Sequence, residues 1–276
     1  MNRTWLITGC STGFGRLLAQ TLLDRGASVA ATARSVEQLA DIGPDTGGRI
    51  VRLAMDVTRG SQIRTAVQAA YERFGRIDVL VNNAGYGYFS THEEGDIDEI
   101  RRMFETNVMG LIRVTQAVLP EMRVRKSGVI VNVSSIAGRV AFPRSSFYSA
   151  SKFAVEALSE SLHHEVRPWG IRVIVIEPGS FDTDFGPRSA VRSPGLTDPS
   201  APYAAQAATW SAVAAKLLPE KQNPLVVVER IIESVNRNES FLRVPVGTDA
   251  ISLVQDRESS GEATFIRTMN ARYDAP

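Results

Sequence analysis

The sequence predicts an α/β fold, with a doubly wound parallel sheet in a single domain. Short apolar runs alternate along most of the chain with longer amphipathic stretches, which is the pattern of successive βαβ units. The apolar runs contain few polar residues, as expected for strands that helices cover on both faces. The chain has 276 residues, of which 43% are hydrophobic and 22% charged, and these values suit one soluble domain with a sizeable core.

Six predicted strands alternate with five predicted helices. The strands are expected at 5–7, 27–32, 50–54, 79–81, 129–133 and 171–176. The helices are expected at 14–25, 59–74, 96–124, 147–167 and 224–237. Gly26 and Gly170 stand where helix C-caps would fall.

The segment from about 184 to 223 interrupts this alternation. It is too long for an ordinary connection. It carries five prolines: Pro187, Pro194, Pro199, Pro202 and Pro219. We interpret the segment as a substrate lid, since long loops in compact domains are usually functional or disordered, and a plain surface excursion is the alternative.

Charge and cysteine content limit the classes of partner. Lys and Arg number 31 against 30 for Asp and Glu, so the net charge of +1 provides no basic footprint for nucleic acid or an anionic membrane. A single cysteine, Cys10, excludes an intramolecular disulfide and fits a reducing compartment. The N-terminus runs directly into a short strand, with too few apolar residues for a signal peptide or membrane span. We therefore expect a cytoplasmic protein that acts on a small molecule.

A glycine-rich turn follows the first predicted strand and reads Thr8-Gly9-Cys10-Ser11-Thr12-Gly13-Phe14-Gly15. Glycines let a backbone turn tightly and approach a pyrophosphate, whose charge is met by the N–H groups and dipole of the next helix. Taken alone, the turn could equally serve tight packing. Its place after the first strand favours a nucleotide site, because the first βα turn of a doubly wound sheet is where nucleotides bind.

The end of the second predicted strand indicates which nucleotide. Enzymes that use NAD commonly place an acid there for the ribose 2′-hydroxyl, whereas this chain has Arg34 followed by Ser35. A guanidinium can pair with a 2′-phosphate, and Ser35 and Ser11 could add hydroxyl donors. The pattern favours NADP, with an exposed arginine at a strand end as the alternative. Asp56 and Val57, after the third strand, would lie under the adenine, although alone they would be an ordinary turn.

Tyr148 and Lys152 open a predicted helix at a four-residue spacing, which places the phenol and the ammonium on one face. A tyrosine is a poor acid or base at neutral pH unless a cation stabilises its phenolate, and Lys152 supplies one. Ser135 ends the fifth predicted strand, and the carboxyl ends of parallel strands border the ligand crevice. Ser135 can therefore face Tyr148, although each of these residues alone would be ordinary.

Six ordered motifs together resemble the short-chain dehydrogenase/reductase family over roughly residues 4–245. They are Thr8-Gly9-x-x-x-Gly13-x-Gly15, Asn82-Asn83-Ala84-Gly85, Asn107, Ser135, Tyr148-x-x-x-Lys152 and Pro178-Gly179. The gap between Gly9 and Gly13 resembles the shorter dehydrogenase branch. The segment from about 246, Val246-Gly247-Thr248-Asp249-Ala250, resembles the C-terminal extension of hydroxysteroid and retinol dehydrogenase-like members. The resemblance implies a Rossmann-type sheet.

The resemblance also implies roles for individual residues. Tyr148 would protonate the carbonyl oxygen, Ser135 would polarise the carbonyl, and Lys152 would bind the nicotinamide ribose and lower the tyrosine pKa. Asn107, at a helix kink, would hold a water that relays protons to the lysine. The expected NADP(H)-binding residues are Gly9, Ser11, Thr12, Gly13, Phe14, Gly15, Arg34, Ser35, Asp56, Val57, Asn83, Ala84, Gly85, Tyr148, Lys152, Pro178, Gly179, Phe181 and Thr183. No metal is required.

The substrate is expected to be an apolar ketone, aldehyde or alcohol. The lid and its surroundings offer a mainly apolar set for its pocket: Val140, Phe142, Phe185, Tyr203, Trp210 and Leu217. The resemblance implies a homodimer or homotetramer that pairs through the helices at 96–124 and 147–167. Two other functions stay open: an NADP-binding regulator without turnover, and a sugar epimerase or dehydratase.

Overall fold

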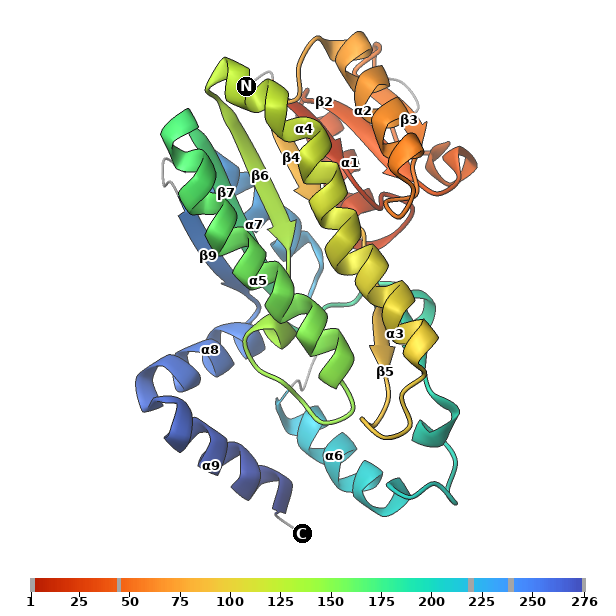
Figure 1. Cartoon of the computed structure of the whole chain (residues 1–276), viewed down its shortest axis with the longest axis vertical. Coiled ribbons are helices and arrows are strands. Elements are labelled where there is room, and N and C mark those ends of the chain that lie inside the picture. Colours follow the sequence, from red (N-terminus) through yellow and green to blue (C-terminus); the bar gives the residue numbers. More distant parts are fainter. Residues whose placement is uncertain (1–2, 44–45, 218–220, 238–240, 275–276) are drawn as a thin grey trace.

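A computed structural model describes residues 3–43, 46–217, 221–237 and 241–274. Within these residues one sheet contains seven parallel strands in the order β3-β2-β1-β4-β6-β7-β9 (Figure 1). The strands are β1 (Thr4–Ile7), β2 (Ser28–Ala33), β3 (Ile50–Ala54), β4 (Val79–Asn82), β6 (Gly128–Val133), β7 (Ile171–Pro178) and β9 (Phe241–Val246). Val131 of β6 lies beside Val81 of β4 and Ile174 of β7, which sets the central register. The predicted fold class is confirmed.

Helices cover both faces of the sheet. The helices are α1 (Gly13–Asp24), α2 (Gly60–Phe74), α3 (Ile97–Phe104), α4 (Leu111–Arg125), α5 (Ser146–Val166), α6 (Ala204–Leu217), α7 (Leu225–Asn236), α8 (Thr248–Ser260) and α9 (Glu262–Asp274). Successive strand residues point to opposite faces, so Ile7 packs with α1 and α7, whereas its neighbour Leu6 packs with α2 and α4. This double coverage explains why the central strands read as apolar runs.

The sheet order reverses beside β1. The chain proceeds from β1 outward through β2 and β3, and then returns to place β4 on the other side of β1. In such sheets ligands bind outside the carboxyl ends of the strands at the reversal. Figure 1 shows α6, α8 and α9 beyond this end of the sheet, so they lie on the side where a ligand is expected.

The helix predicted at 96–124 is two helices. A π-helical turn, Glu105–Gly110, separates α3 from α4. The amide of Asn107 bonds to the backbone of Tyr86 and to the hydroxyl of Ser151, which holds the extra residue of the turn inward. Gly110 ends the turn against Val57, where a Cβ would come within 2.7 Å of Val57 Cγ2. In the sequence, Asn107 and Gly110 are the polar and small residues within an apolar helical pattern that mark the break between α3 and α4.

Several elements were not predicted. β9 was missed because Arg243 and Pro245 interrupt its apolar pattern, and both are tolerated because β9 is an edge strand. The expected lid is not a long irregular loop: it contains a turn (Phe185–Ser189), strand β8 (Ala190–Arg192) and α6, and β8 pairs with β5 (Gly87–Phe89). The C-terminal extension forms α8 and α9. Residues 218–220 of the expected lid, with Pro219, lie outside the described residues.

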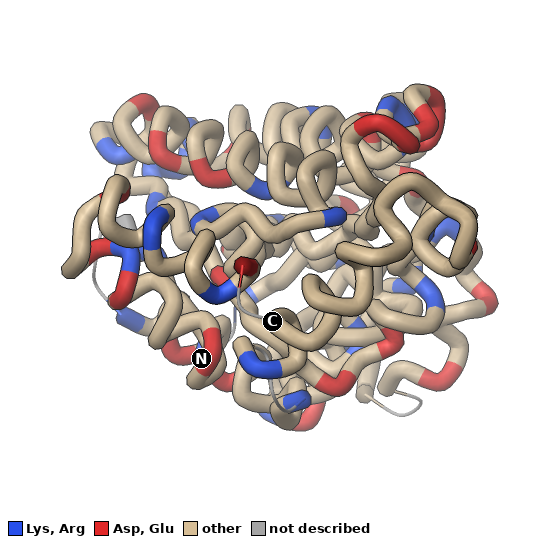
Figure 2. Tube along the Cα trace, turned by 90° about the horizontal axis from the view of Figure 1, so that it is seen from below, with Lys and Arg blue, Asp and Glu red and all other residues tan. Residues whose placement is uncertain are grey.

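Acidic and basic residues are mixed at the end of the molecule where the parallel strands finish. Figure 2 views the backbone from this end and shows residues of both signs without a large region of one sign. No helix among the described residues is long and apolar enough to cross a membrane.

Candidate active site

A cavity of about 1480 Å³ opens at the carboxyl ends of the strands. Its volume exceeds the ~300–1,000 Å³ of an ordinary small-molecule pocket, so it has room for a dinucleotide and a substrate together. The predicted site residues that line it are Gly9, Ser11, Thr12, Gly13, Phe14, Arg34, Asp56, Val57, Asn83, Ala84, Gly85, Ser135, Tyr148, Lys152, Pro178, Gly179, Phe181 and Thr183. Gly15, Ser35 and Asn107 are not among its lining residues.

The glycine-rich turn needs its glycines for two different reasons. Gly9 and Gly13 have φ values of 72° and 59°, a left-handed region that side chains disfavour. A Cβ at Gly9 would lie 2.9 Å from the Cα of Ala84, so the backbone of the turn packs directly on the next loop. Gly15 faces inward instead, since its Cβ would meet Gly9 O at 2.5 Å. Gly15 therefore lets α1 begin close to the turn.

Side chains fasten the turn to the loop after β4. The buried hydroxyl of Thr8 accepts hydrogen bonds from the N–H groups of Asn83 and Ala84, both at 2.9 Å. Asn83 Nδ2 donates in return to Thr8 O at 2.8 Å. The two loops that flank the reversal point are thus held in one geometry, with free N–H groups of α1 directed at the cavity.

Arg34 and Ser35 differ in what they reach. The Arg34 side chain is exposed and lines the cavity, and it forms no ion pair with any other described residue. The hydroxyl of Ser35 bonds to the carboxylate of Glu37. Ser35 therefore does not offer its hydroxyl to the cavity, whereas the guanidinium of Arg34 is available for an anion.

Tyr148 and Lys152 lie one turn apart on α5, and both are buried, with 8% and 7% of their surfaces exposed. Lys152 Nζ donates to Val133 O at 2.9 Å and lies 5.8 Å from the centre of the Tyr148 ring. Ser135 caps the short turn after β6, where its Oγ accepts from Ala137 N at 3.1 Å. These contacts fix a phenol, an ammonium and a hydroxyl at one wall of the cavity.

Burial moves the two pKa values of α5 in opposite directions. It raises the pKa of Tyr148 to about 12, which the Ser135 hydroxyl partly offsets, and it lowers the pKa of Lys152 to about 8. The sequence led us to expect a lowered tyrosine pKa. Burial is instead the main influence on the pKa of Tyr148, and the ammonium of Lys152 is directed at Val133 O. Tyr148 therefore holds its proton at neutral pH, as a proton donor must.

Asn107 supports the site from behind the cavity wall. Its Nδ2 donates to Tyr86 O at 2.8 Å and to Ser151 Oγ at 3.1 Å, while its Oδ1 accepts from Tyr86 N at 3.0 Å. Gly85 must stay small beside it, because a Cβ there would lie 3.0 Å from Asn107 Oδ1 and 3.8 Å from Lys152 Nζ. The Asn107 amide is thus occupied by the Tyr86 backbone.

The loop after β7 is fixed by the C-terminal extension. Ser180 N donates to Asp249 Oδ2 at 2.6 Å, and Gly179 N donates to Val246 O at 2.9 Å. Gly179 packs so closely that a Cβ would lie 2.1 Å from Asp249 Oδ1. The ring of Phe181 meets Phe14 edge to face at 5.7 Å. The loop therefore lies firmly over the glycine-rich turn.

Aromatic side chains line the cavity near the expected lid, together with Arg144, Arg188 and Arg192. Phe142, Phe185 and Trp210 line it as predicted, together with Phe89 and Tyr273, which the sequence did not indicate. Three residues of the predicted apolar set do not line it. Val140 and Leu217 pack against α8 and α9, and Tyr203 bonds to Glu93.

Tyr273 and Arg144 are among the lining residues that the sequence did not indicate. Tyr273 reaches the cavity from α9, more than a hundred residues after Tyr148, so only the folded chain brings them together. Arg144 precedes α5 in a left-handed conformation, with φ 67°, and its Nη1 donates to Ser211 Oγ of α6 at 3.0 Å. Arg144 therefore ties the expected lid to the start of α5. Among the described residues no group of three His, Cys, Asp or Glu is placed to hold a metal.

Comparisons with known proteins identify one protein family. The profile of the short chain dehydrogenase family matches residues 3–191. The chain is 38% identical over 256 residues to oxidoreductase BOA17 of Botryotinia fuckeliana, covering 91% of each chain. A solved short-chain dehydrogenase from Streptomyces avermitilis superposes with a TM-score of 0.85 at 35% identity, covering 100% of this chain and 98% of that one.

Two further solved structures contain a nicotinamide cofactor. A short-chain dehydrogenase from Burkholderia cenocepacia in complex with NADP has a TM-score of 0.76 at 27% identity, covering 100% of this chain and 98% of that one. One from Burkholderia phymatum in complex with NAD has a TM-score of 0.79 at 26% identity, covering 94% of each chain. Chains of this fold thus hold either dinucleotide.

Proposed function

The chain belongs to the short-chain dehydrogenase family, and from that premise we propose that it is an NADP(H)-dependent oxidoreductase that interconverts a ketone or aldehyde with an alcohol. One observation carries the proposal. A protonated Tyr148, the ammonium of Lys152 and the hydroxyl of Ser135 share a cavity wall with a glycine-rich turn whose backbone is shaped for a phosphate. Such a set can hold a carbonyl oxygen and deliver a proton to it.

The roles of the residues follow from their positions. The hydroxyls of Ser135 and Tyr148 would bind the carbonyl oxygen, and Tyr148 would donate its proton as negative charge develops there. Lys152 would stabilise the resulting phenolate and hold the ribose of the cofactor. A bound NADPH supplies the hydride for the carbonyl carbon. Asn107 would keep the backbone around Tyr86 in place beside the lysine, and a water held there for proton relay remains part of the proposal.

Arg34 supports NADP over NAD. It stands at the end of β2, where an acid for a ribose 2′-hydroxyl is absent, and its guanidinium is free of ion pairs within the described residues. A 2′-phosphate would give it a partner. Asp56 and Val57 line the same end of the cavity and would flank the adenine.

The aromatic side chains that line the cavity near the expected lid support an apolar carbonyl substrate. Phe142, Phe185 and Trp210 offer ring faces to a hydrocarbon body, with the reacting carbonyl directed at Tyr148. We propose that residues 184–217 cover the bound substrate as a lid, with Arg144 as their tie to the catalytic helix.

A homo-oligomer is also part of the proposal. Figure 1 shows α4 and α5 side by side on one face. Their side chains Val124 and Phe153 are 74% and 38% exposed, respectively. An oligomer that pairs these helices would bury both side chains. Light scattering of the purified protein would give twice or four times the chain mass if the proposal holds.

A panel of ketones and aldehydes with NADPH tests the proposed activity. We expect NADPH oxidation with apolar members, and loss of at least ~100-fold in kcat for Tyr148→Phe, because the proton donor is removed. NADPH should still bind to the variant, as fluorescence titration would show. Tight NADPH binding by the unaltered protein without turnover of any panel member would instead favour a nucleotide-binding regulator.

A further inference from the structure

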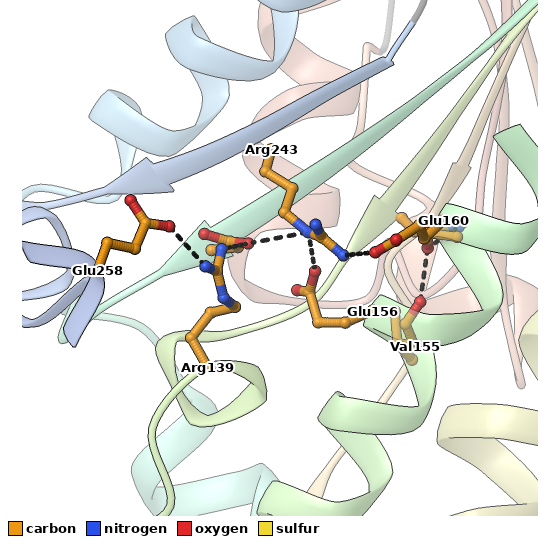
Figure 3. Close-up of polar contacts among 9 residues, drawn as sticks. Arg139, Val155, Glu156, Glu160, Arg243 and Glu258 are labelled. Atoms are coloured by element: carbon orange, nitrogen blue, oxygen red, sulfur yellow. Dashed lines mark hydrogen bonds and ion pairs between the residues drawn. The ribbon is translucent and has the colours of Figure 1, made fainter. Parts of the chain in front are cut away.

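A partly buried network of arginines and glutamates joins α5, β9 and α8, and none of its residues lines the cavity (Figure 3). Arg139 pairs with Glu177 at 2.9 Å and with Glu258 of α8 at 2.7 Å. Arg243 of β9 pairs with Glu156 at 3.0 Å and with Glu160 at 2.6 Å, both on α5. Two arginines thus join the short turn after Ser135, the catalytic helix, the edge of the sheet and the C-terminal extension.

Two carboxylates of this network are incompletely satisfied. The side chains of Glu156 and Glu177 are 6% and 0% exposed. One oxygen of each, Glu156 Oε1 and Glu177 Oε2, is buried without a hydrogen-bond partner among the described residues. No described donor offsets the charge on these oxygens, although burial and Glu156 raise the pKa of Glu177 to about 7. The network therefore leaves negative potential directed at neighbouring buried groups.

Lys152 is a nearby buried cation that a negative potential would stabilise. Its ammonium is buried, its hydrogen bond is to the neutral carbonyl of Val133, and no described carboxylate lies within ion-pair distance of it. A buried ammonium without a counter-charge tends to lose its proton. The proposed reaction requires that proton, since a neutral amine would not stabilise the phenolate of Tyr148.

Glu156 is the acid placed to meet this need. It follows Lys152 by one helical turn on α5, so both side chains lie on one face of the helix. Gly138 shows how closely the region is packed, because a Cβ there would lie 3.1 Å from Lys152 O and 3.2 Å from Glu156 Cγ. Both residues are buried, with 7% of Lys152 and 5% of Glu156 exposed, so their charges are screened less than a pair at the surface.

We infer that Glu156 is a positioning residue that keeps the ammonium of Lys152 protonated at neutral pH, with Arg243 setting the strength of its field. The inference rests on the proposed function, in which Lys152 acts on Tyr148. Burial of Lys152 lowers its pKa, and the charge of Glu156 opposes that fall. Arg243 pairs with Glu156 as well as with Glu160. Its positive charge partly offsets the negative charge of Glu156 and so weakens the effect of Glu156 on the lysine.

The charged groups that face this region come from five elements. Glu156 also raises the pKa of Glu177, in addition to burial, while Arg139 and Arg243 oppose that rise. The set is Tyr148, Lys152, Glu156, Glu160 and His164 of α5, Arg139 after the 136–138 turn, Glu177 of β7, Arg243 of β9 and Glu258 of α8.

The test is a direct titration of Lys152. The chain has four lysines, Lys126, Lys152, Lys216 and Lys221, so ¹³C-lysine labelling yields few side-chain signals, and Lys152→Met assigns the one of interest. We expect Glu156→Gln to lower the titration midpoint of Lys152 by roughly half to one pH unit. Arg243→Gln should raise the titration midpoint of Lys152, because the guanidinium no longer offsets the charge of Glu156. A purely structural role would not produce shifts of opposite sign.

Glu160→Gln is the matched control, and Glu156→Asp is the rescue. Glu160 pairs with the same arginine but is 53% exposed and one turn farther from Lys152, so its loss should leave the midpoint within ~0.2 pH unit of the parent. Glu156→Asp keeps the charge and should retain most of the parent value. Equal shifts for Glu156→Gln and Glu160→Gln, or no shift for either, would overturn the inference.

Kinetics then separate this inference from the proposed function. If the enzyme reduces carbonyls, the alkaline limb of kcat/KM should move with the lysine midpoint in each variant. Thermal melting of each variant at neutral pH confirms that it is folded. Lysine shifts without turnover would leave Glu156 as the counter-charge and reject the reductase proposal, whereas turnover with an unshifted lysine would reject the role of Glu156 alone.

Discussion

At the residue scale, the proposed chemistry depends on burial of Tyr148 and Lys152. Both side chains are buried near the start of α5. Burial favours the neutral form of each, because it raises the pKa of Tyr148 and lowers the pKa of Lys152. A neutral phenol is the state that a reductase needs. A neutral amine is not, so the alkaline range should be where the site fails first.

The pH dependence of activity should follow Lys152. Burial lowers the pKa of Lys152 to about 8, so the ammonium is present below that pH and is lost as the pH rises through it. We expect kcat/KM for carbonyl reduction to fall about tenfold per pH unit on this alkaline limb. A profile that stays flat to pH 10 would show that the ammonium is not required or that the bound cofactor raises its pKa.

The choice of nucleotide should depend on Arg34. Arg34→Asp replaces a cation with an acid that can accept from a ribose 2′-hydroxyl and repels a 2′-phosphate. We expect the ratio of kcat/KM for NADPH over NADH to fall by about 100-fold or more. Arg59→Asp changes an exposed arginine that does not line the cavity, and it should leave the ratio unchanged. Equal ratios for all three proteins would exclude Arg34 from phosphate recognition.

At the scale of elements, the π-helical turn between α3 and α4 positions the wall behind Lys152. Asn107 satisfies both the N–H and the carbonyl of Tyr86, next to Gly85. The loop after β4 is thereby held from behind by Asn107 and from the front by Thr8. The cavity-lining residues of this loop are therefore held in place by Asn107 and Thr8, which do not themselves line the cavity.

Removal of the Asn107 amide should weaken this loop. Asn107→Leu has a similar shape but leaves the Tyr86 backbone groups unpaired, which costs about 2–3 kcal/mol for buried polar groups. We expect a lower free energy of unfolding in urea and weaker NADPH binding. A stable variant with unchanged binding would mean that water replaces the amide.

At the scale of the whole molecule, the C-terminal extension completes both the core and the cavity. Phe265 and Met269 of α9 pack on Val254 of α8 and on Ile136, next to Ser135. Tyr273 then reaches the cavity, and Asp249 fixes the loop after β7. The last segment of the chain thus contributes to both ends of the site.

Adjacent residues of α9 allow a matched test of this contribution. Phe265 is 4% exposed, so Phe265→Ala should cost about 3–5 kcal/mol of unfolding free energy and raise KM for bulky carbonyls by loosening Tyr273. Ile266 is 47% exposed, and Ile266→Ala should change stability by less than ~1 kcal/mol. Similar losses for the two variants would mean that α9 does not pack as described.

Much of the fold and site could be predicted because the information is local. The apolar runs, the glycine-rich turn and the spacing of Tyr148 and Lys152 are each contained within a few residues, and strand order places their ends at one edge of the sheet. Three of the predicted site residues do not line the cavity, because contacts with other residues hold them elsewhere. Ser35 turns to Glu37, Gly15 packs on Gly9, and Asn107 bonds to Tyr86.

The sequence by itself therefore determined the fold class and the family, with the set of residues from which a nicotinamide site is proposed. Only the tertiary structure revealed β9, the arrangement of α6, α8 and α9 around the cavity, and the network of arginines and glutamates that joins α5 to β9. The physical reason is that periodicity and motif spacing report a residue's own element. Burial, counter-charge and cavity lining instead arise between segments such as α5 and β9, which are adjacent only after folding.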